Sequence, residues 1–299
     1  MTTLVTGASG HVGGAIARRL ITSGDEVFAL GRQRPELPGL AGWVEADLGA
    51  TAGSRLAELV AATIGTRCEA IVHAAAAIEH DPHAVAVSLV NCAGTQRMLE
   101  LAELAGAERF AYISGVPVIG RPRRLPVDEE HPVDPPTAYH AAKLYGERLV
   151  ELARRRGLAA ASLRLTSPVG PGMPPGRIMS VFVRSAVEGR PLEVAGSGSR
   201  AQDYIDVRDA AAAVEACLAR GEAGLYNVAA GRAVSNLELA DACVATFASS
   251  SEVLVGARPD PEDEVRWEVS IERARARLGF EPRHGLAESI RAVAEDSPG

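Results

Sequence analysis

The segment TAYHAAKLYGE carries a tyrosine and a lysine whose side chains together suit proton transfer. Tyr139 and Lys143 are four residues apart, so on a helix both side chains project from one face. An ammonium group beside a phenol favours the phenolate and lowers the phenol's pKa from its ordinary value of about 10. The pair therefore predicts a general acid and base, in which Tyr139 moves the proton and Lys143 tunes it.

A glycine motif near the N-terminus predicts a nucleotide site. The segment LVTGASGHVGGAIARRL places its glycines between a predicted strand and a predicted helix. One glycine permits the sharp turn, another lets a phosphate approach, and a third permits close packing of helix on strand. The free N–H groups and positive dipole at the helix start suit a pyrophosphate. The alternative is that Gly10 and Gly13 only permit tight packing. The expected cofactor-binding residues are Gly7, Ser9, Gly10, His11, Val12 and Gly13.

The segment FALGRQRP, at the end of the second predicted strand, bears on the choice of dinucleotide. An acidic residue at this place would accept hydrogen bonds from both ribose hydroxyls of NAD. Here Gly31 leaves room, and Arg32 and Arg34 supply cations that suit a 2′-phosphate. We expect NADP(H) in preference to NAD(H). The alternative is that both arginines are solvated and that NAD(H) binds without the usual carboxylate.

Two further segments are expected to border the dinucleotide. Asp47 and Leu48, in the segment EADL, are placed to border the adenine. The segment VHAAAAI ends a predicted strand in small residues, which would let a dinucleotide pass. His73 in that segment is expected to be a packed strand residue rather than a catalyst. The small residues are Ala74, Ala75 and Ala76.

These segments must be positioned by alternating strands and helices. Short apolar runs predict strands, and helix-length amphipathic segments lie between most of them. This alternation predicts an α/β fold of the Rossmann type, a doubly wound parallel sheet with helices on both faces. The predicted strands are residues 3–6, 26–30, 42–45, 70–73, 109–114 and 160–165, and the helices include residues 11–23, 82–105 and 136–156.

The character of the chain changes after Leu165. The segment TSPVGPGMPPGR is dense in Pro and Gly, and the later predicted helices alternate with short strands. We expect residues 1–165 to form a dinucleotide-binding Rossmann domain, to which part of residues 200–230 returns. Residues 166–299 are expected to form mainly a smaller α/β substrate-binding lobe. The later helices are predicted at residues 178–188, 207–219, 235–247 and 271–278.

The composition of the chain excludes several classes of binding partner. The formal net charge of −7 and the pI near 5.6 give no general attraction for nucleic acid or for anionic membranes. No apolar run approaches the roughly 18 residues that span a bilayer. The four cysteines show neither zinc-site spacing nor the pattern of a secreted disulfide framework. We expect a cytoplasmic protein with a small-molecule substrate and no metal, membrane or nucleic-acid partner.

The order of these motifs resembles that of the extended short-chain dehydrogenase/reductase family, which contains NAD-dependent epimerases and dehydratases of nucleotide sugars. The resemblance implies that Tyr139 moves the proton of the reacting hydroxyl or carbonyl, while Lys143 binds the nicotinamide ribose and tunes the tyrosine. It also implies a cofactor role for Asn91, and a homodimer paired through the helices at residues 82–105 and 136–156. It rests on TGASGHVG, DL, HAAA, NCAGT, YISGVPVIG, YHAAK, LRLTSPVGPG, GSGSRAQDYIDVRDAA, LYNVAAG and SIERARARLGF.

The chain departs from the family pattern where a hydroxyl is expected. A serine or threonine after the fifth strand polarises the substrate oxygen in the family, and this chain has Gly115 there. The adjacent Ser114 would point to the opposite face of the strand, and Thr137 is another candidate donor. Three explanations stay open. Another hydroxyl or water substitutes, or weaker oxyanion stabilisation costs about 10²–10³ in rate, or the protein binds a dinucleotide without fast turnover.

The predicted substrate lobe also departs from the family pattern. Ser167 stands where an asparagine would hold the substrate's diphosphate, and Gln202 stands where an arginine is usual, with Arg200 two residues earlier. We expect these three residues and Gly115 to contact the substrate. The loop cluster Arg121, Arg123 and Arg124 either compensates for the altered ligands or is solvated.

Three functions follow from the sequence. The first is an NAD(P)-dependent epimerase, dehydratase or ketoreductase of a nucleotide sugar, and the whole-chain resemblance favours it. The second is an NADPH-dependent reductase or dehydrogenase of a non-nucleotide ketone or secondary alcohol, which Ser167 and Gln202 favour. The third is a non-catalytic dinucleotide-binding protein. Gly115 is its support, whereas Tyr139 and Lys143 argue against it.

Overall fold

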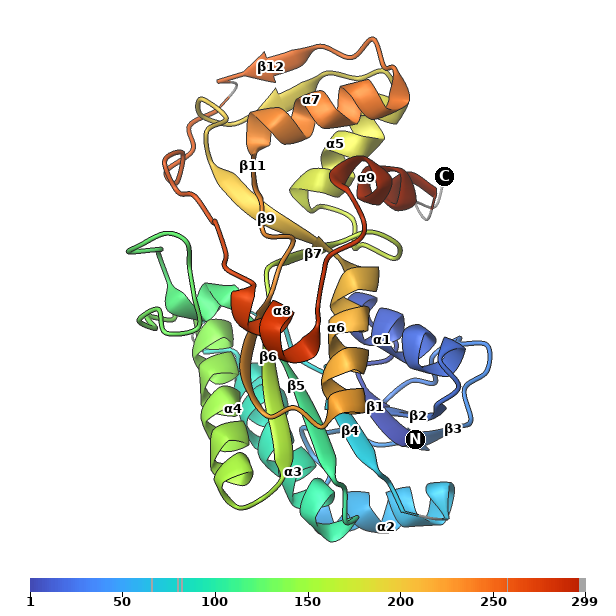
Figure 1. Ribbon diagram of the computed structural model, residues 1–299. Coiled ribbons are helices and arrows are strands. Elements are labelled where there is room, and N and C mark those ends of the chain that lie inside the picture. The colour runs from blue at the N-terminus through green and yellow to red at the C-terminus, as the bar shows by residue number, and fades with distance from the viewer. Residues whose placement is uncertain (66, 80, 82, 257, 296–299) are drawn as a thin grey trace.

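Figure 1 shows the computed structural model of the chain, in which a smaller lobe sits on a larger one built around a parallel sheet. The structure describes residues 1–65, 67–79, 81, 83–256 and 258–295. Nine α-helices lie within these residues. None of the helices in these ranges is long and apolar enough to cross a membrane.

The larger lobe contains seven strands, and every neighbouring pair in the sheet is parallel. Their order is β10-β6-β5-β4-β1-β2-β3, so the direction of winding reverses between β1 and β4. Ligands of such sheets bind at the carboxyl ends of the strands beside this reversal. The strand predictions are confirmed, with each end within one residue. The strands are β1 (Thr2–Thr6), β2 (Glu26–Gly31), β3 (Gly42–Glu45), β4 (Ala70–His73), β5 (Arg109–Gly115), β6 (Ala159–Leu165) and β10 (Gly224–Val228).

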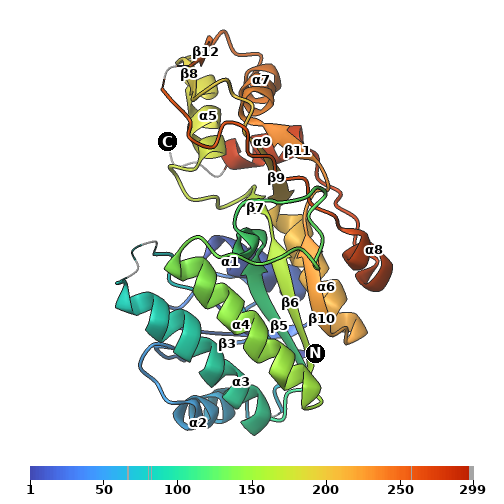
Figure 2. The same ribbon diagram turned by 90° about the vertical axis from the view of Figure 1, so that its left-hand side faces the viewer.

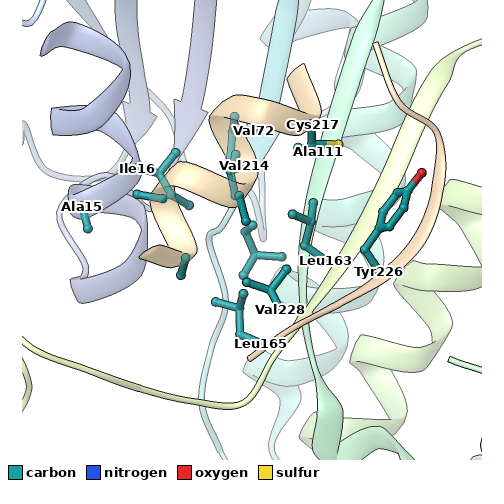
Figure 3. Packing of buried hydrophobic residues seen from close by; sticks show 14 of the residues in the cluster. Ala15, Ile16, Val72, Ala111, Leu163, Leu165, Val214, Cys217, Tyr226 and Val228 are labelled. Atoms are coloured by element: carbon teal, nitrogen blue, oxygen red, sulfur yellow. The ribbon is translucent and has the colours of Figure 1, made fainter. Parts of the chain in front are cut away.

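Helices cover both faces of this sheet, which confirms the Rossmann-type fold (Figure 1). Successive strand residues point to opposite faces, so Leu4 and Val5 of β1 enter two different apolar clusters. Figure 3 shows one cluster, in which Ile16 and Val214 from the helices meet Leu163 from the sheet. That face carries α1 (His11–Thr22) and α6 (Val207–Arg220), and the other carries α2 (Gly53–Ile64), α3 (Gly94–Leu104) and α4 (Ala138–Arg155).

Four of the predicted helices begin later than expected, those predicted at residues 235–247 and 271–278 by one residue and the other two by more. A π-helical segment η1 (Val87–Ala93) precedes α3, so residues 82–105 are not one regular helix, and residue 82 itself lies outside the described residues. The helix α4 begins at Ala138 because Thr137 caps it, its hydroxyl accepting from the His140 N–H. A short 3-10 helix η2 (Val116–Ile119) follows β5.

The smaller lobe has its own apolar cluster, formed by α5, α7 and α9 against short strands. Figure 2 shows α8 beside the larger lobe, where it packs on α6 and β10. The chain therefore crosses between the lobes several times, and the binding role of the smaller lobe stays a prediction. The elements are β7 (Ser167–Val169), α5 (Ile178–Val187), β8 (Leu192–Val194), β9 (Ala201–Asp206), β11 (Ala233–Ser235), α7 (Asn236–Phe247), β12 (Val253–Val255), α8 (Glu272–Leu278) and α9 (Leu286–Glu295).

Close packing of α4 on β5 depends on one glycine. An ideal Cβ at Gly146 would lie 2.3 Å from the hydroxyl oxygen of Tyr112, whose ring is fully buried in β5. A rigid buried ring cannot move aside at low cost. The missing side chain at Gly146 therefore sets how near α4 lies to the strand that ends at Gly115.

We expect Gly146→Ala to lower the free energy of unfolding by about 1–3 kcal/mol, the usual cost of overpacking. This is opposite to the ordinary effect, since alanine stabilises a helix interior by about 1 kcal/mol relative to glycine. Urea denaturation measures the difference. Gly285→Ala is the matched control, because an added Cβ there meets no described heavy atom within 4 Å. A Gly146→Ala protein as stable as the wild type would contradict this account.

Candidate active site

A cavity of about 810 Å³ opens at the carboxyl ends of the parallel strands. The turn between β1 and α1 and the ends of β2, β4 and β5 form one side of it. The first turns of α4 and residues of the smaller lobe form the other side. The cavity therefore joins the predicted cofactor residues to the predicted catalytic pair.

The glycine turn has the geometry that the motif predicts. Gly7 has a φ of 71°, and an ideal Cβ there would lie 2.7 Å from the Ala75 nitrogen. At Gly13 a Cβ would lie 2.2 Å from the Gly7 carbonyl oxygen, so this position packs helix on strand. At Gly10 a Cβ would meet only that same oxygen within 4 Å among the described residues, at 3.3 Å. Gly10 thus leaves the space above the start of α1 open, which fits a pyrophosphate.

Residues around that turn border the cavity as expected. Burial lowers the pKa of His11 to about 4, with Asp206 acting in the opposite direction, so its imidazole is neutral near pH 7. The helix dipole and the main-chain N–H groups, rather than His11, are therefore the groups at this end that could bind an anion. The predicted residues that line the cavity here are Gly7, Ser9, Gly10, His11, Val12 and Gly13.

The two arginines proposed for the 2′-phosphate, which follow β2, differ in their position relative to the cavity. Arg32 is exposed and lines the cavity together with Gly31. Arg34 is exposed as well, but within the described residues it is not part of the cavity wall. Asp47 and Leu48 line the same end, and the Asp47 carboxylate accepts a hydrogen bond of 2.7 Å from the Gly49 N–H.

The end of β4 is held in place by residues behind it. Ala74, Ala75 and Ala76 line the cavity as expected. Asn91 does not line it within the described residues, and its side-chain amide instead bonds both the N–H and the carbonyl of Ala77, at 2.7 and 2.8 Å. Asn91 therefore fixes the segment that borders the cavity.

His73 is a packed residue of the sheet, in agreement with the sequence. Its Nδ1 lies 2.8 Å from the Thr6 hydroxyl, and its Nε2 lies 3.1 Å from the Thr95 hydroxyl. Burial lowers the pKa of His73 to about 3, and the nearby charge of Lys143 acts in the same direction. The imidazole is thus neutral and structural.

Tyr139 and Lys143 lie on one face of α4 and both line the cavity. Lys143 is only 3% exposed, and its ammonium donates a hydrogen bond of 2.7 Å to the Ile113 carbonyl. It lies 5.8 Å from the centroid of the Tyr139 ring. Burial lowers the pKa of Lys143 to about 8, while Glu147 acts in the opposite direction.

The pKa of Tyr139 differs from the expectation. Burial raises it, and the cation that opposes this rise is Arg177 rather than Lys143. The reason is that Lys143 is itself desolvated and directs its ammonium to a carbonyl of β5. Spacing on the helix placed the two residues correctly, whereas the balance of burial and charge depends on the surrounding tertiary structure.

The three positions around the expected hydroxyl have distinct surroundings. The Ser114 hydroxyl donates to the Glu147 carboxylate at 2.7 Å, and the Thr137 hydroxyl lies 2.8 Å from His140 Nδ1. Gly115 lines the cavity in extended backbone, with φ −140° and ψ 142°. An ideal Cβ there would make only ordinary contacts, at 3.5 Å to Pro117 and 3.7 Å to Leu165. Neither backbone conformation nor protein packing therefore requires glycine at this position.

The predicted substrate residues fall into two places. Ser167 and Gln202 line the cavity, and the Ser167 hydroxyl donates to the Gln202 side-chain oxygen at 2.8 Å. Arg200 lies instead in a second cavity and forms ion pairs with Glu262 at 2.7 Å and Asp260 at 3.7 Å.

The basic loop cluster of residues 121–124 is largely neutralised by its neighbours. Arg123 pairs with Asp134 at 3.1 Å, and Arg124 pairs with Asp128 at 2.7 Å. These exposed pairs fit solvated loop residues better than phosphate ligands. The described residues also contain no group of three or more His, Cys, Asp or Glu side chains placed to hold a metal ion.

Sequence reasoning missed several residues of the cavity wall, among them Arg177 and Tyr204. Arg177 stands at the N-cap position of α5, lines the cavity, and opposes the rise in the pKa of Tyr139. Tyr204 lines the cavity too, and its buried hydroxyl has no hydrogen-bond partner among the described residues. A basic residue directly after the segment GPGMPPG was the only signal for Arg177, and β9 alternation could have placed Tyr204 beside Gln202.

The second cavity adjoins the first, because Gly176 and Ile178 line both. Its walls come from α5, β8 and the segment around residues 258–260. Three arginines and two carboxylates border it, and ion pairs of Arg200 with Asp260 and Glu262 and of Arg190 with Glu188 neutralise part of its positive charge. The arginines are Arg190, Arg200 and Arg258, and the carboxylates are Glu193 and Asp260.

Comparisons with known proteins agree with this geometry. The sequence model of the NAD dependent epimerase/dehydratase family matches residues 3–229. A UDP-glucose 4-epimerase of Mycolicibacterium smegmatis is 32% identical over 99% of this chain and 98% of its own length. A dTDP-glucose 4,6-dehydratase of Streptomyces niveus is 31% identical over 74% of this chain and 68% of its own. The solved structure of MoeE5 in complex with UDP-glucose and NAD superposes with a TM-score of 0.84, at 26% identity, over 99% of this chain and 98% of that one.

Proposed function

The chain belongs to the NAD dependent epimerase/dehydratase family, and on that basis we propose that it is an NAD(P)-dependent epimerase, dehydratase or ketoreductase of a nucleotide sugar. One observation carries the proposal. A single cavity joins the glycine turn to Tyr139 and Lys143, so a dinucleotide and a proton-transfer pair share one space. The relatives from Mycolicibacterium and Streptomyces act, by their names, on UDP-glucose and dTDP-glucose.

The second cavity supports a nucleotide sugar over a smaller alcohol or ketone. A sugar at Tyr139 that carries a nucleoside diphosphate needs a neighbouring space for its anionic part. The adjoining cavity offers such a space, and guanidinium groups suit phosphate oxygens. Phosphate oxygens would compete there with Asp260 and Glu262 for Arg200 and with Glu188 for Arg190. The likeness to MoeE5, which was solved with UDP-glucose and NAD, supports the same substrate class.

The residues of the first cavity fit a nicotinamide dinucleotide. The N–H groups at the start of α1 would hold its pyrophosphate, and Lys143 would bind the nicotinamide ribose. When bound, the dinucleotide supplies the acceptor and donor of hydride. Tyr139 then takes the proton from a substrate hydroxyl as the carbon is oxidised, and returns it to the carbonyl oxygen when that carbon is reduced.

We expect Tyr139→Phe to lower kcat by about 10²–10⁴-fold while leaving dinucleotide affinity nearly unchanged, because the phenol acts chiefly in the transition state. Lys143→Met should lower both, since this side chain also binds the ribose. Steady-state kinetics with UDP-glucose and dTDP-glucose, together with dinucleotide titration, measure the two effects. Tyr145→Phe, an exposed position on the same helix, is the matched control. Full turnover by Tyr139→Phe would refute the catalytic assignment.

For Gly115→Ser we expect a rise in KM with little change in stability. The added Cβ makes only ordinary protein contacts, so a defect must come from the substrate side of the cavity. The proposal is that Gly115 makes room for a bulky substituent next to the reacting carbon. An unchanged KM would exclude this role, and an unchanged KM with a higher kcat would show instead that a missing oxyanion donor had been restored.

We further propose that NADP(H) is preferred and that Arg32 contacts its 2′-phosphate. Charge-assisted hydrogen bonds of this kind contribute about 1.5–3 kcal/mol, so NADPH should bind at least tenfold more tightly than NADH. Isothermal titration with both dinucleotides measures this ratio. Arg32→Gln should remove the preference, whereas Arg34→Gln is the matched control, an exposed arginine outside the described cavity wall. Equal affinities of the wild type would rule the preference out.

We also propose a homodimer in which η1, α3 and α4 of two copies pair. Leu89 of η1 and Leu152 of α4 are 44% and 54% exposed, so apolar side chains are available on these elements. Light scattering after size exclusion should give twice the chain mass of 31.2 kDa, and the mass of one chain would contradict pairing.

We also propose that the protein is cytoplasmic, because all four cysteines are free thiols.

A further inference from the structure

A buried carboxylate on α4 has no role in the chemistry described so far. Glu147 lies one helical turn beyond Lys143, and its side chain is buried between α4 and the sheet. It accepts a hydrogen bond from the Ser114 hydroxyl at 2.7 Å. It also forms a two-point ion pair with Arg164, at 2.8 Å to Nε and 2.7 Å to Nη2.

These contacts tie α4 to the carboxyl ends of two neighbouring strands. Ser114 of β5 and Arg164 of β6 are directly paired in the sheet, so Glu147 spans both. The residue before Ser114 is Ile113, whose carbonyl accepts a hydrogen bond from the Lys143 ammonium. The residue after Ser114 is Gly115, which lines the cavity. Holding Ser114 therefore fixes both the anchor of Lys143 and the wall of the site.

We propose that Glu147 is a positioning residue for the reaction, which holds the end of β5 through Ser114 and Arg164 and whose negative charge keeps the buried Lys143 ammonium protonated. This inference rests on the proposed function, in which a charged Lys143 binds the ribose and acts beside Tyr139. It assigns a role to a side chain that reaches neither substrate nor dinucleotide.

Few groups act on the pKa of the Lys143 ammonium. Burial lowers the pKa of Lys143 to about 8, and Glu147 is the carboxylate that opposes this effect. The other groups that face the ammonium are the neutral His73 from β4, the ring of Tyr112 from β5 at 5.0 Å, and the ring of Tyr139. Without Glu147, the Lys143 ammonium would lose its counter-charge, and Arg164 would become a second buried cation without one.

Stability alone gives a weak reason for this arrangement. Two desolvated charges cost several kcal/mol each, and well-packed apolar side chains at such places are often equally stable or more stable. The buried ion pair of Glu147 and Arg164 is better explained by the effect of the Glu147 charge on the protonation of Lys143. The expected sign follows: with Glu147 neutral, Lys143 loses its proton at a lower pH.

The sequence allows a direct test, because Lys143 is the only lysine in the chain. Protein grown with lysine labelled with carbon-13 at Cε gives one side-chain signal, and its chemical shift against pH reports the protonation of Lys143 in the free protein. The wild-type midpoint should lie at about pH 8. In Glu147→Gln, which keeps the size and an acceptor oxygen, it should fall by about one pH unit or more.

Matched variants separate charge from structure. Glu151→Gln removes a charge from the same helix at a half-buried carboxylate that pairs with Arg154 and Arg155, and should leave the midpoint unchanged. Glu147→Asp keeps the charge and should hold the midpoint above that of Glu147→Gln. If Glu147→Gln does not fold, Glu147→Gln combined with Arg164→Gln removes both buried charges, and its midpoint should still lie below that of the wild type.

The decline of kcat/KM at alkaline pH should move with the midpoint, since the charged lysine is the active form. A midpoint that is the same in Glu147→Gln and the wild type, with the fold intact, would overturn the inference. That outcome says nothing against Tyr139 as the proton carrier. Conversely, full activity of Tyr139→Phe would refute the proposed function, although the titration of Lys143 could still shift as expected.

Discussion

A charged lysine held almost out of water is the constraint on which the site depends. Lys143 is 3% exposed, so its ammonium must be compensated by groups that the fold supplies. The Ile113 carbonyl gives a hydrogen bond acceptor, and Glu147 gives the opposite charge. Both require α4 to lie close to the end of β5, and the absent side chain of Gly146 permits that approach. The compensation of the Lys143 charge therefore depends on the close packing of α4 on β5.

The same constraint explains which parts were predictable from the sequence. Strands β1 to β6 are local apolar runs, and the glycine turn is a local steric requirement, so both follow from the residues themselves. The placement of Tyr139 and Lys143 follows from helix spacing. The contact of the Ser114 hydroxyl with Glu147 of α4 agrees with strand alternation, although Ser114 also borders the cavity.

Features that were not predictable involve distant segments. Glu147 meets Ser114 and Arg164, which are 33 and 17 residues away in the chain, and no periodicity indicates that encounter. Arg200 lies two residues from Gln202 but in the neighbouring cavity, held by acids near residue 260. The raised pKa of Tyr139 likewise results from burial by several elements. Sequence pattern indicates the candidate catalytic groups, whereas tertiary packing decides their charge states.

Under the proposed function, the site would separate the binding of an anionic substrate from proton transfer. Gly115 and the neutral pair Ser167 and Gln202 line the first cavity together with the cations Lys143 and Arg177. Three further arginines border the second cavity, which adjoins the first at Gly176 and Ile178. A cation placed beside Tyr139 would stabilise its phenolate and hold the proton less tightly at every stage of the reaction. The cation that acts on the pKa of Tyr139 is Arg177 of the first cavity and not an arginine of the second. Under the proposed function, an anionic substrate would therefore be bound in the second cavity without fixing the protonation of Tyr139. Arg177, at the boundary of the two cavities, is the one described cation that acts on both His11 and Tyr139, so it is where binding of an anion and proton transfer would be coupled.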